Sequence, residues 1–162
     1  MLREVCNNPW IELVILMGFL APIIVEDIRF KRIPDVLILP AIGVFVLKRV
    51  VYGEDQVYRL LLCGSWGFGF ILALNFLFRG KIGLGDGKLS ALLAIVFGFQ
   101  GWLVALFIAS SVGLLYGGLM MKCGCMKRDE RIPYAPFLAL GGLVSFFVQN
   151  YLFMKAGWVW RL

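Results

Sequence analysis

Six long apolar runs, separated by short polar connections, dominate this chain of 162 residues. Hydrophobic residues make up 61% of it, whereas a soluble domain is nearer half apolar, and about 20 apolar residues cross a bilayer as a helix. The runs are too continuous for the short alternating segments of a membrane β-barrel. We therefore expect an all-α membrane protein, a single domain over residues 1–162, built as a bundle of about six transmembrane helices. The expected spans are residues 10–25, 36–52, 57–78, 84–99, 102–121 and 137–153.

The basic residues are distributed unevenly between the two sides of such a bundle. The connections after the first, third and fifth spans (residues 26–35, 79–88 and 122–131) carry ten Lys and Arg residues, and the opposite side carries six. The positive-inside rule places the richer side in the cytoplasm. We therefore expect a multi-pass protein of the cell membrane with its N-terminus outside. Its basic residues would contact anionic lipid headgroups rather than nucleic acid.

The chain has no histidine, which excludes a His-based nucleophilic site and a His-ligated metal. Cys123 and Cys125 form a single CxC pair, and no second pair with zinc-ligand spacing accompanies it. We expect neither a metal nor another cofactor.

Two carboxylates, Asp27 and Asp86, abut long apolar runs at the same expected membrane face. A carboxylate at the edge of the hydrocarbon is costly and is a functional candidate by default. Asp86 lies in the turn Gly83-Leu84-Gly85-Asp86-Gly87-Lys88. Its glycines permit positive φ and would let a substrate backbone approach. The sequence therefore predicts a site on the cytoplasmic side, built around these two residues.

Two neighbouring carboxyl groups that share one proton can hydrolyse a peptide bond. One is ionised and activates a water, and the other is protonated and donates to the carbonyl oxygen. The helix following Asp86 favours its charge, so we expect Asp86 to be ionised and Asp27 to carry the proton. Spacing leaves Asp35 open as an alternative partner of Asp86. A simpler interpretation is a tight loop in which Asp86 caps the next helix.

Polar side chains near these carboxylates have simpler interpretations as well. Lys88 would hold substrate, tune Asp86 or extend its ammonium group to the headgroups. Asn75, inside the third apolar run, is expected to bond to another helix rather than to substrate.

Three segments together resemble the type IV prepilin peptidases, a family of GxGD aspartic proteases. The first, from Glu26-Asp27-Ile28-Arg29 to Arg32-Ile33-Pro34-Asp35, resembles the family's Asp followed by Ile-Pro-Asn. The second is the turn Gly83 to Leu89. The third is Arg131-Ile132-Pro133-Tyr134-Ala135-Pro136-Phe137-Leu138, where the family usually has Ile-Pro-Phe-Gly-Pro-Phe-Leu.

The resemblance implies a membrane-embedded endopeptidase that removes the basic leader of prepilin-like proteins at the cytoplasmic face. The substrates would be pilin, pseudopilin, Flp-type or archaellin-type precursors, cut after a Gly just before their hydrophobic helix. By position, Asp27 and Asp86 would be the catalytic pair, and Asp35 falls at the family's Asn. The residues implied to shape the site or bind substrate are Gly83, Gly85, Lys88, Pro34, Asp35, Pro133 and Pro136.

Bifunctional members of the family carry two CxxC pairs in an early cytoplasmic insertion that is associated with N-methylation. This chain passes directly from its first apolar run to Asp27, so we expect peptidase activity without methyl transfer. The alternative is a non-catalytic membrane scaffold or transporter subunit of the same fold. A presenilin-like protease shares the GxGD turn, but its partner Asp follows a Tyr, whereas Asp27 follows Glu26.

Overall fold

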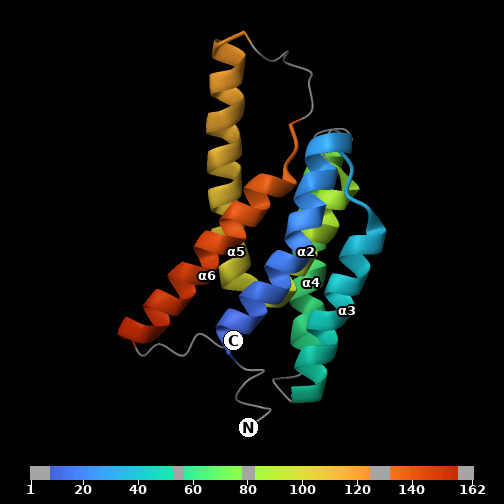
Figure 1. The fold of residues 1–162 in the computed structure, drawn as a ribbon, viewed down its shortest axis with the longest axis vertical. Helices are drawn as coiled ribbons and strands as arrows, with labels where there is room; N and C mark the ends of the chain where they lie inside the picture. Colours follow the sequence, from blue (N-terminus) through green and yellow to red (C-terminus); the bar gives the residue numbers. More distant parts are fainter. Residues whose placement is uncertain (1–7, 53–56, 78–82, 125–131, 157–162) are drawn as a thin grey trace.

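The computed structural model describes residues 8–52, 57–77, 83–124 and 132–156, and every regular element in these ranges is a helix. The helices are α2 Pro9–Phe30, α3 Asp35–Tyr52, α4 Val57–Leu77, α5 Leu84–Lys122 and α6 Ala135–Ala156 (Figure 1). The prediction of an all-α protein is confirmed. Two segments, Tyr58–Leu77 and Leu84–Lys122, are long and apolar enough to cross a membrane. The count of six spans remains a prediction.

Helix α2 continues past its predicted end, so Asp27 lies on a helix. The helix ends at Phe30, and Lys31 follows in the left-handed conformation (φ 52°), donating its backbone N–H to the Asp27 carbonyl oxygen. The prediction that residues 26–30 belong to the connection is therefore wrong. Asp27 extends the buried face of the helix, because its neighbours on that face repeat every three or four residues. The buried residues of α2 are Leu16, Leu20, Ile23 and Asp27.

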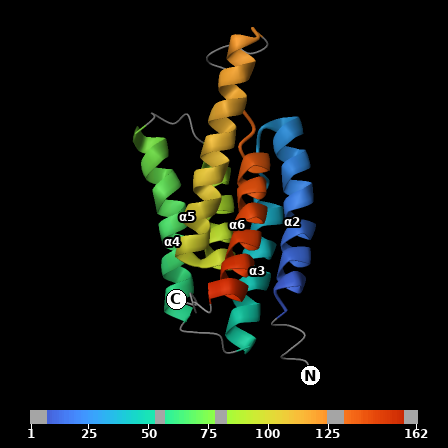
Figure 2. The ribbon, with the colours of Figure 1, turned by 90° about the vertical axis from the view of Figure 1, so that its left-hand side faces the viewer.

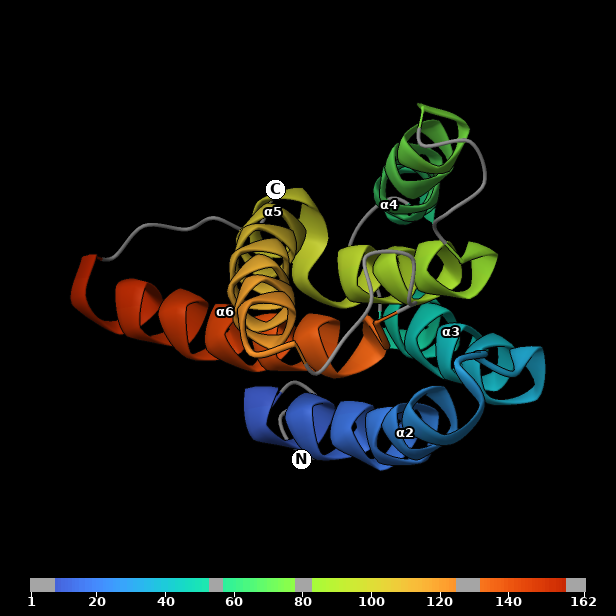
Figure 3. The same ribbon diagram turned by 90° about the horizontal axis from the view of Figure 1, so that it is seen from above.

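Helix α5 is broken at Gly98, which has φ 69° and ψ 178°. Only glycine adopts this backbone conformation readily. The break turns the chain back on itself (Figures 1 and 3), and the Trp102 indole N–H reaches Ser90 Oγ at 2.7 Å, twelve residues earlier. The predicted runs 84–99 and 102–121 thus correspond to the two halves of α5. The predicted connection at Gln100 and Gly101 is misplaced, because both residues are helical.

Side chains from α3 and α6 satisfy backbone carbonyl groups around this break. Arg49 donates to the Val96 carbonyl at 3.0 Å, and the Gln149 amide donates to the Phe97 carbonyl at 3.0 Å. These are the carbonyl groups at the end of the first half of α5, which have no partner within that half. The break is therefore anchored to two other helices.

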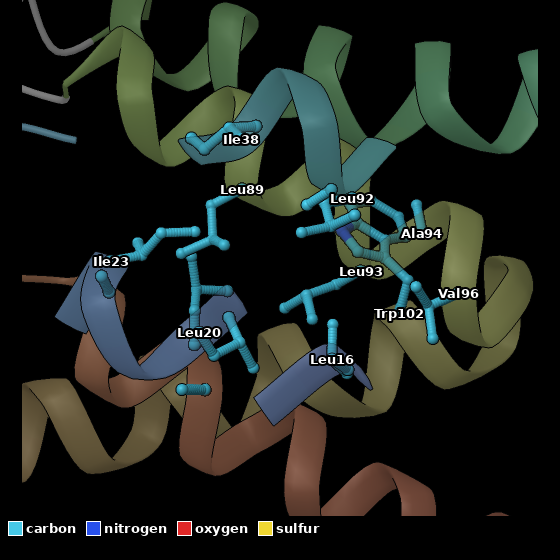
Figure 4. Close-up of a cluster of buried hydrophobic side chains, with 14 of the residues drawn as sticks. Leu16, Leu20, Ile23, Ile38, Leu89, Leu92, Leu93, Ala94, Val96 and Trp102 are labelled. Atoms are coloured by element: carbon cyan, nitrogen blue, oxygen red, sulfur yellow. The ribbon is translucent and has the colours of Figure 1, made fainter. Parts of the chain in front are cut away.

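The core lies where α2 and α3 pack against the first half of α5. Figure 4 shows Leu16, Leu20 and Ile23 of α2 facing side chains of α5, including Leu89, Leu93 and Trp102. Figure 2 shows α6 crossing the second half of α5. Seen from above, α4 stands beside the first half of α5 and apart from α2 and α6 (Figure 3). The first half of α5 is thus the central element, and its N-terminal end carries the glycine turn.

Candidate active site

The carboxylate of Asp27 holds the N-terminus of α6. Its Oδ2 accepts a hydrogen bond from the Ala135 backbone N–H at 2.9 Å, and the Tyr134 backbone N–H also favours the charged carboxyl group. Amide groups at the start of a helix have no partner within it and favour a negative charge. The first and third sequence motifs, more than a hundred residues apart, therefore meet at one side chain.

Asp27 is 4% exposed and lies beyond the expected membrane span 10–25. Burial raises the pKa of the Asp27 carboxyl group, and the amide donors of Ala135 and Tyr134 oppose that rise. These donors are fixed by the backbone of α6, so they stabilise the ionised carboxylate in one orientation.

Asp86 occupies the third position of α5, and Gly83 is the N-cap. The Asp86 backbone N–H donates to the Gly83 carbonyl at 3.2 Å, and the Gly83 backbone N–H bonds the Asp86 carboxyl group in return. A side chain at the third position that reaches back to the N-cap amide is the acidic half of a capping box. The suggestion that Asp86 itself is the N-cap residue is therefore wrong, although its carboxyl group does cap the helix.

The structure brings the two carboxyl groups to one place. The end of α2, the start of α5 and the start of α6 lie at the same end of the bundle (Figures 1 and 2). The charge of Asp27 acts on the Asp86 carboxyl group, and the charge of Asp86 acts on the Tyr134 phenol. The two carboxyl groups are therefore near enough for the charge of one to influence the other.

Asp35 and Lys88 form an ion pair with each other. Asp35 is the first residue of α3, and its side chain is 54% exposed. The Asp35 carboxylate therefore pairs with the Lys88 ammonium group. The carboxylate whose charge acts on Asp86 is that of Asp27. The pair ties the start of α3 to the start of α5.

The prolines of the motifs lie at helix starts. Pro34 precedes α3 and its carbonyl accepts from the Leu37 N–H at 3.2 Å. Pro133 precedes Tyr134, and Pro136 is the second residue of α6. A proline in the first helical turn costs no hydrogen bond, because that N–H has no partner within the helix. These prolines shape the backbone beside Asp27 and Asp35.

Two glycines of the turn have a use that was not expected from the sequence. A Cβ atom added to Gly85 would lie 2.9 Å from Ile33 Cβ, and one added to Gly87 would lie 3.2 Å from the Phe68 ring. At these two positions the space is filled by the protein itself, and the approach of a substrate to the turn stays a prediction. Gly85 lets the first motif pack directly on the second.

We expect Gly85→Ala to lower the free energy of unfolding by about 1–3 kcal/mol, the usual cost of overpacking. The new methyl group meets a Cβ atom, which moves only with its backbone. Chemical denaturation in detergent measures the change. Gly118→Ala on the same helix is the control, because nothing lies within 4 Å of the added atom. Equal stability of the two variants would contradict the contact with Ile33.

Two features of the site were not expected from the sequence. The Tyr134 hydroxyl lies 3.1 Å from Ser110 Oγ. Burial raises the pKa of this phenol, and the hydrogen bond with Ser110 opposes that rise. The sequence did carry a signal for this contact, because Tyr134 stands where the family usually has Phe. The buried Asn75 Oδ1 has no hydrogen-bond partner within the described part of the chain, so this oxygen does not form the expected bond to another helix. Among the described residues, no three acidic, Cys or His side chains are grouped to hold a metal ion.

Comparisons with known proteins agree on one family. The profile of the Type IV leader peptidase family matches residues 14–118. A prepilin leader peptidase/N-methyltransferase of Bacillus subtilis is 28% identical over 133 residues, which cover 82% of this chain and 54% of the relative. The protein of that name from Xanthomonas campestris is 32% identical over 146 residues, which cover 85% of this chain and 50% of the relative. The protein of that name from Escherichia coli is 28% identical over 137 residues, which cover 78% of this chain and 58% of the relative.

The chain thus spans about half the length of the curated relatives that it matches. No solved structure matches it.

Proposed function

The chain belongs to the type IV leader peptidase family, and from that premise we propose that it is an aspartic endopeptidase that removes the leader of prepilin-like proteins. The observation that carries the proposal is the meeting of the family's motifs at one end of the bundle (Figure 1), where the Asp27 carboxylate accepts from the Ala135 N–H and its charge acts on Asp86. The relatives' printed name supports the substrate class. The partners are prepilin-like substrates and the lipid bilayer, and no nucleic acid is involved.

We propose that Asp27 is ionised and Asp86 carries the shared proton, the reverse of the assignment expected from the sequence. The Ala135 N–H at the start of α6 donates to the Asp27 carboxylate at 2.9 Å, and the Tyr134 backbone N–H further favours its charge, whereas the Gly83 amide is the backbone donor that favours the charge of Asp86 among the described residues. Hydrogen bonds to the charged form favour it. Asp27 is then the general base and Asp86 the general acid.

In the first step, Asp27 takes a proton from water as the water oxygen bonds to the scissile carbonyl carbon. Asp86 gives its proton to the carbonyl oxygen, which forms a neutral gem-diol. In the second step, protonated Asp27 gives its proton to the amide nitrogen as the C–N bond breaks. The Asp86 carboxylate takes a proton from a gem-diol hydroxyl, which restores both groups and leaves a carboxylic acid and an amine.

We propose that the six apolar segments each cross or enter the membrane and that the site faces the cytoplasm. The larger number of Lys and Arg residues in connections on that side supports this orientation. The break at Gly98 supports counting α5 as two segments. The scissile bond would then lie at the cytoplasmic surface of the membrane, between the basic leader of the substrate and its hydrophobic helix.

Cleavage of a defined precursor tests the function. The purified protein in detergent is incubated with a prepilin-type substrate that contains its basic leader and the hydrophobic segment, and mass spectrometry identifies the products. We expect one cut, just before the hydrophobic segment. The control substrate has its junction glycine replaced by a bulky residue. Recovery of intact substrate with folded protein would reject the proposal in favour of a non-catalytic scaffold.

A further inference from the structure

Three contacts hold the segment before α6 against the second half of α5. The Tyr134 hydroxyl lies 3.1 Å from Ser110 Oγ, and a Cβ atom added to Gly113 would lie 3.9 Å from the Tyr134 ring. One added to Gly117 would lie 2.9 Å from the side chain of Ile132. Positions 110, 113 and 117 are three and four residues apart, so they share one face of the helix. The segment from Ile132 to Tyr134 therefore runs along that face before α6 begins.

The hydrogen bond between Tyr134 and Ser110 is the directional contact of the three. Apolar contacts are non-directional and allow a segment to slide along a helix. A hydrogen bond requires its two oxygen atoms within a narrow range of distances and angles. Tyr134 is half-buried and packs on the hydrophobic core, so its ring has little freedom to follow a moving backbone. The bond therefore fixes the position of the backbone at Tyr134.

The backbone at Tyr134 determines where the first amide groups of α6 point. The Tyr134 carbonyl accepts hydrogen bonds from the Phe137 and Leu138 N–H groups, each at 3.1 Å, so the hydrogen bonding of α6 begins at this residue. The next amide along the chain, the Ala135 N–H, donates to Asp27 Oδ2 at 2.9 Å. Because a planar peptide joins the two residues, a displacement of Tyr134 would displace this donor as well.

From this arrangement we propose that Tyr134 is a positioning residue for Asp27: its hydroxyl, held by Ser110, keeps the Ala135 N–H on the carboxylate. The inference rests on the proposed function, in which this carboxylate activates the water. Tyr134 acts through the backbone and transfers no proton. The family usually has Phe at this position, so the hydroxyl adjusts the catalytic pair and does not supply the chemistry.

Titratable groups reach Asp27 from α5 and from the segment before α6. The Asp86 carboxyl group interacts with the charge of Asp27, and the Tyr134 phenol with the charge of Asp86. The charged side chains at the starts of α3 and α5, Asp35 and Lys88, pair with each other. Burial raises the pKa of the phenol, so it is uncharged at neutral pH. Removing its hydroxyl, or the partner of that hydroxyl, therefore removes no charge from the site.

Tyr134→Phe and Ser110→Ala each remove the hydrogen bond and leave every charge in place. The amide donor is then less well fixed, so the pKa of Asp27 should rise. The acidic limb of the pH profile of kcat/KM should move upward by about 0.5–1 pH unit. On that limb cleavage falls about threefold to tenfold, and at higher pH, where Asp27 is ionised in each variant, it should approach the wild-type rate. Both changes together should act like either one, because they remove the same bond.

Tyr116→Phe is the matched control, because it removes the same atom from a tyrosine of α5. The Tyr116 side chain is 41% exposed and packs its ring on Phe137 of α6, with centroids 5.5 Å apart, a contact that does not need the hydroxyl. Its pH profile should coincide with that of the wild type. Unchanged profiles of Tyr134→Phe and Ser110→Ala would overturn the inference. A loss of cleavage that is equal at every pH would overturn it too.

Hydrogen exchange keeps this inference distinct from the proposed function, because it needs no substrate. NMR in detergent follows the Ala135 amide in the wild type and in Tyr134→Phe, with the amide of buried Leu93 as internal reference. Relative to Leu93, the Ala135 amide should exchange about threefold to tenfold faster in the variant. An unchanged ratio of the two exchange rates would reject the role of Tyr134 alone. Absent cleavage by the wild type would reject the peptidase function alone.

Discussion

Asp86→Asn is expected to lower the rate of leader cleavage by about 10²–10⁴-fold, the usual contribution of a positioned acid or base. The amide has nearly the same shape as the carboxyl group, so the helix start should persist. It cannot transfer the proton that the carbonyl oxygen requires. The same loss is expected for Asp27→Asn, which removes the general base. Initial rates with a prepilin-type substrate measure both, after thermal unfolding in detergent has established that each variant is folded.

Asp35→Asn is the control for this pair. Asp35 is also a carboxylate of the first motif, but it is exposed and paired with Lys88. An exposed ion pair contributes about 0–1 kcal/mol, so cleavage and stability should change little. If Asp35→Asn abolished cleavage while Asp27→Asn left it intact, the assignment of Asp27 as the catalytic partner of Asp86 would be wrong.

Gly141→Ala is expected to cause the largest loss of stability of any change considered for the helix packing. A Cβ atom at this position would lie 2.1 Å from the carbonyl oxygen of Ala105 and 2.9 Å from its carbonyl carbon. Small residues let helix backbones approach in this way. Because the obstacle is backbone, α5 and α6 must move apart along their whole contact. We expect a loss at or above about 3 kcal/mol, the upper end for overpacking.

The unfolding transition in detergent measures this loss, with Gly43→Ala as control. Gly43 is within α3, and nothing lies within 4 Å of an added Cβ. Alanine at an unobstructed helix position is more favourable than glycine by about 0.5–1 kcal/mol, so the control should be as stable as the wild type or more so. A Gly141→Ala protein with wild-type stability would contradict the close approach of α5 and α6.

Most of the helices were predictable from the sequence, because a long apolar run in a membrane protein must pair its own backbone groups and a helix does so. The predicted segment 36–52 differs from α3 by one residue at its start, and α4 agrees with the predicted segment 57–78 over the described residues, which end at Leu77. The position of the break in α5 was not predictable from the apolar pattern. It depends on the backbone conformation of Gly98 and on Arg49 and Gln149, which are distant in sequence.

The candidate site was predictable as a set of residues but not as an arrangement. Spacing left Asp27 and Asp35 equivalent as partners of Asp86. The difference between them is tertiary: Asp27 extends a buried helix face and meets the start of α6, whereas Asp35 meets Lys88. The role of Gly85 was missed for the same reason, since its contact with Ile33 joins two segments separated by a whole helical hairpin.

The central claim is that Asp27 and Asp86 act as one catalytic unit, and a double-mutant cycle tests it most directly. Residual cleavage is measured for Asp27→Asn, Asp86→Asn and the protein with both changes. Groups that act together are strongly non-additive. We predict that the double variant cleaves at the same residual rate as either single variant. A double variant slower by the product of the two single losses would show independent contributions and would contradict the account.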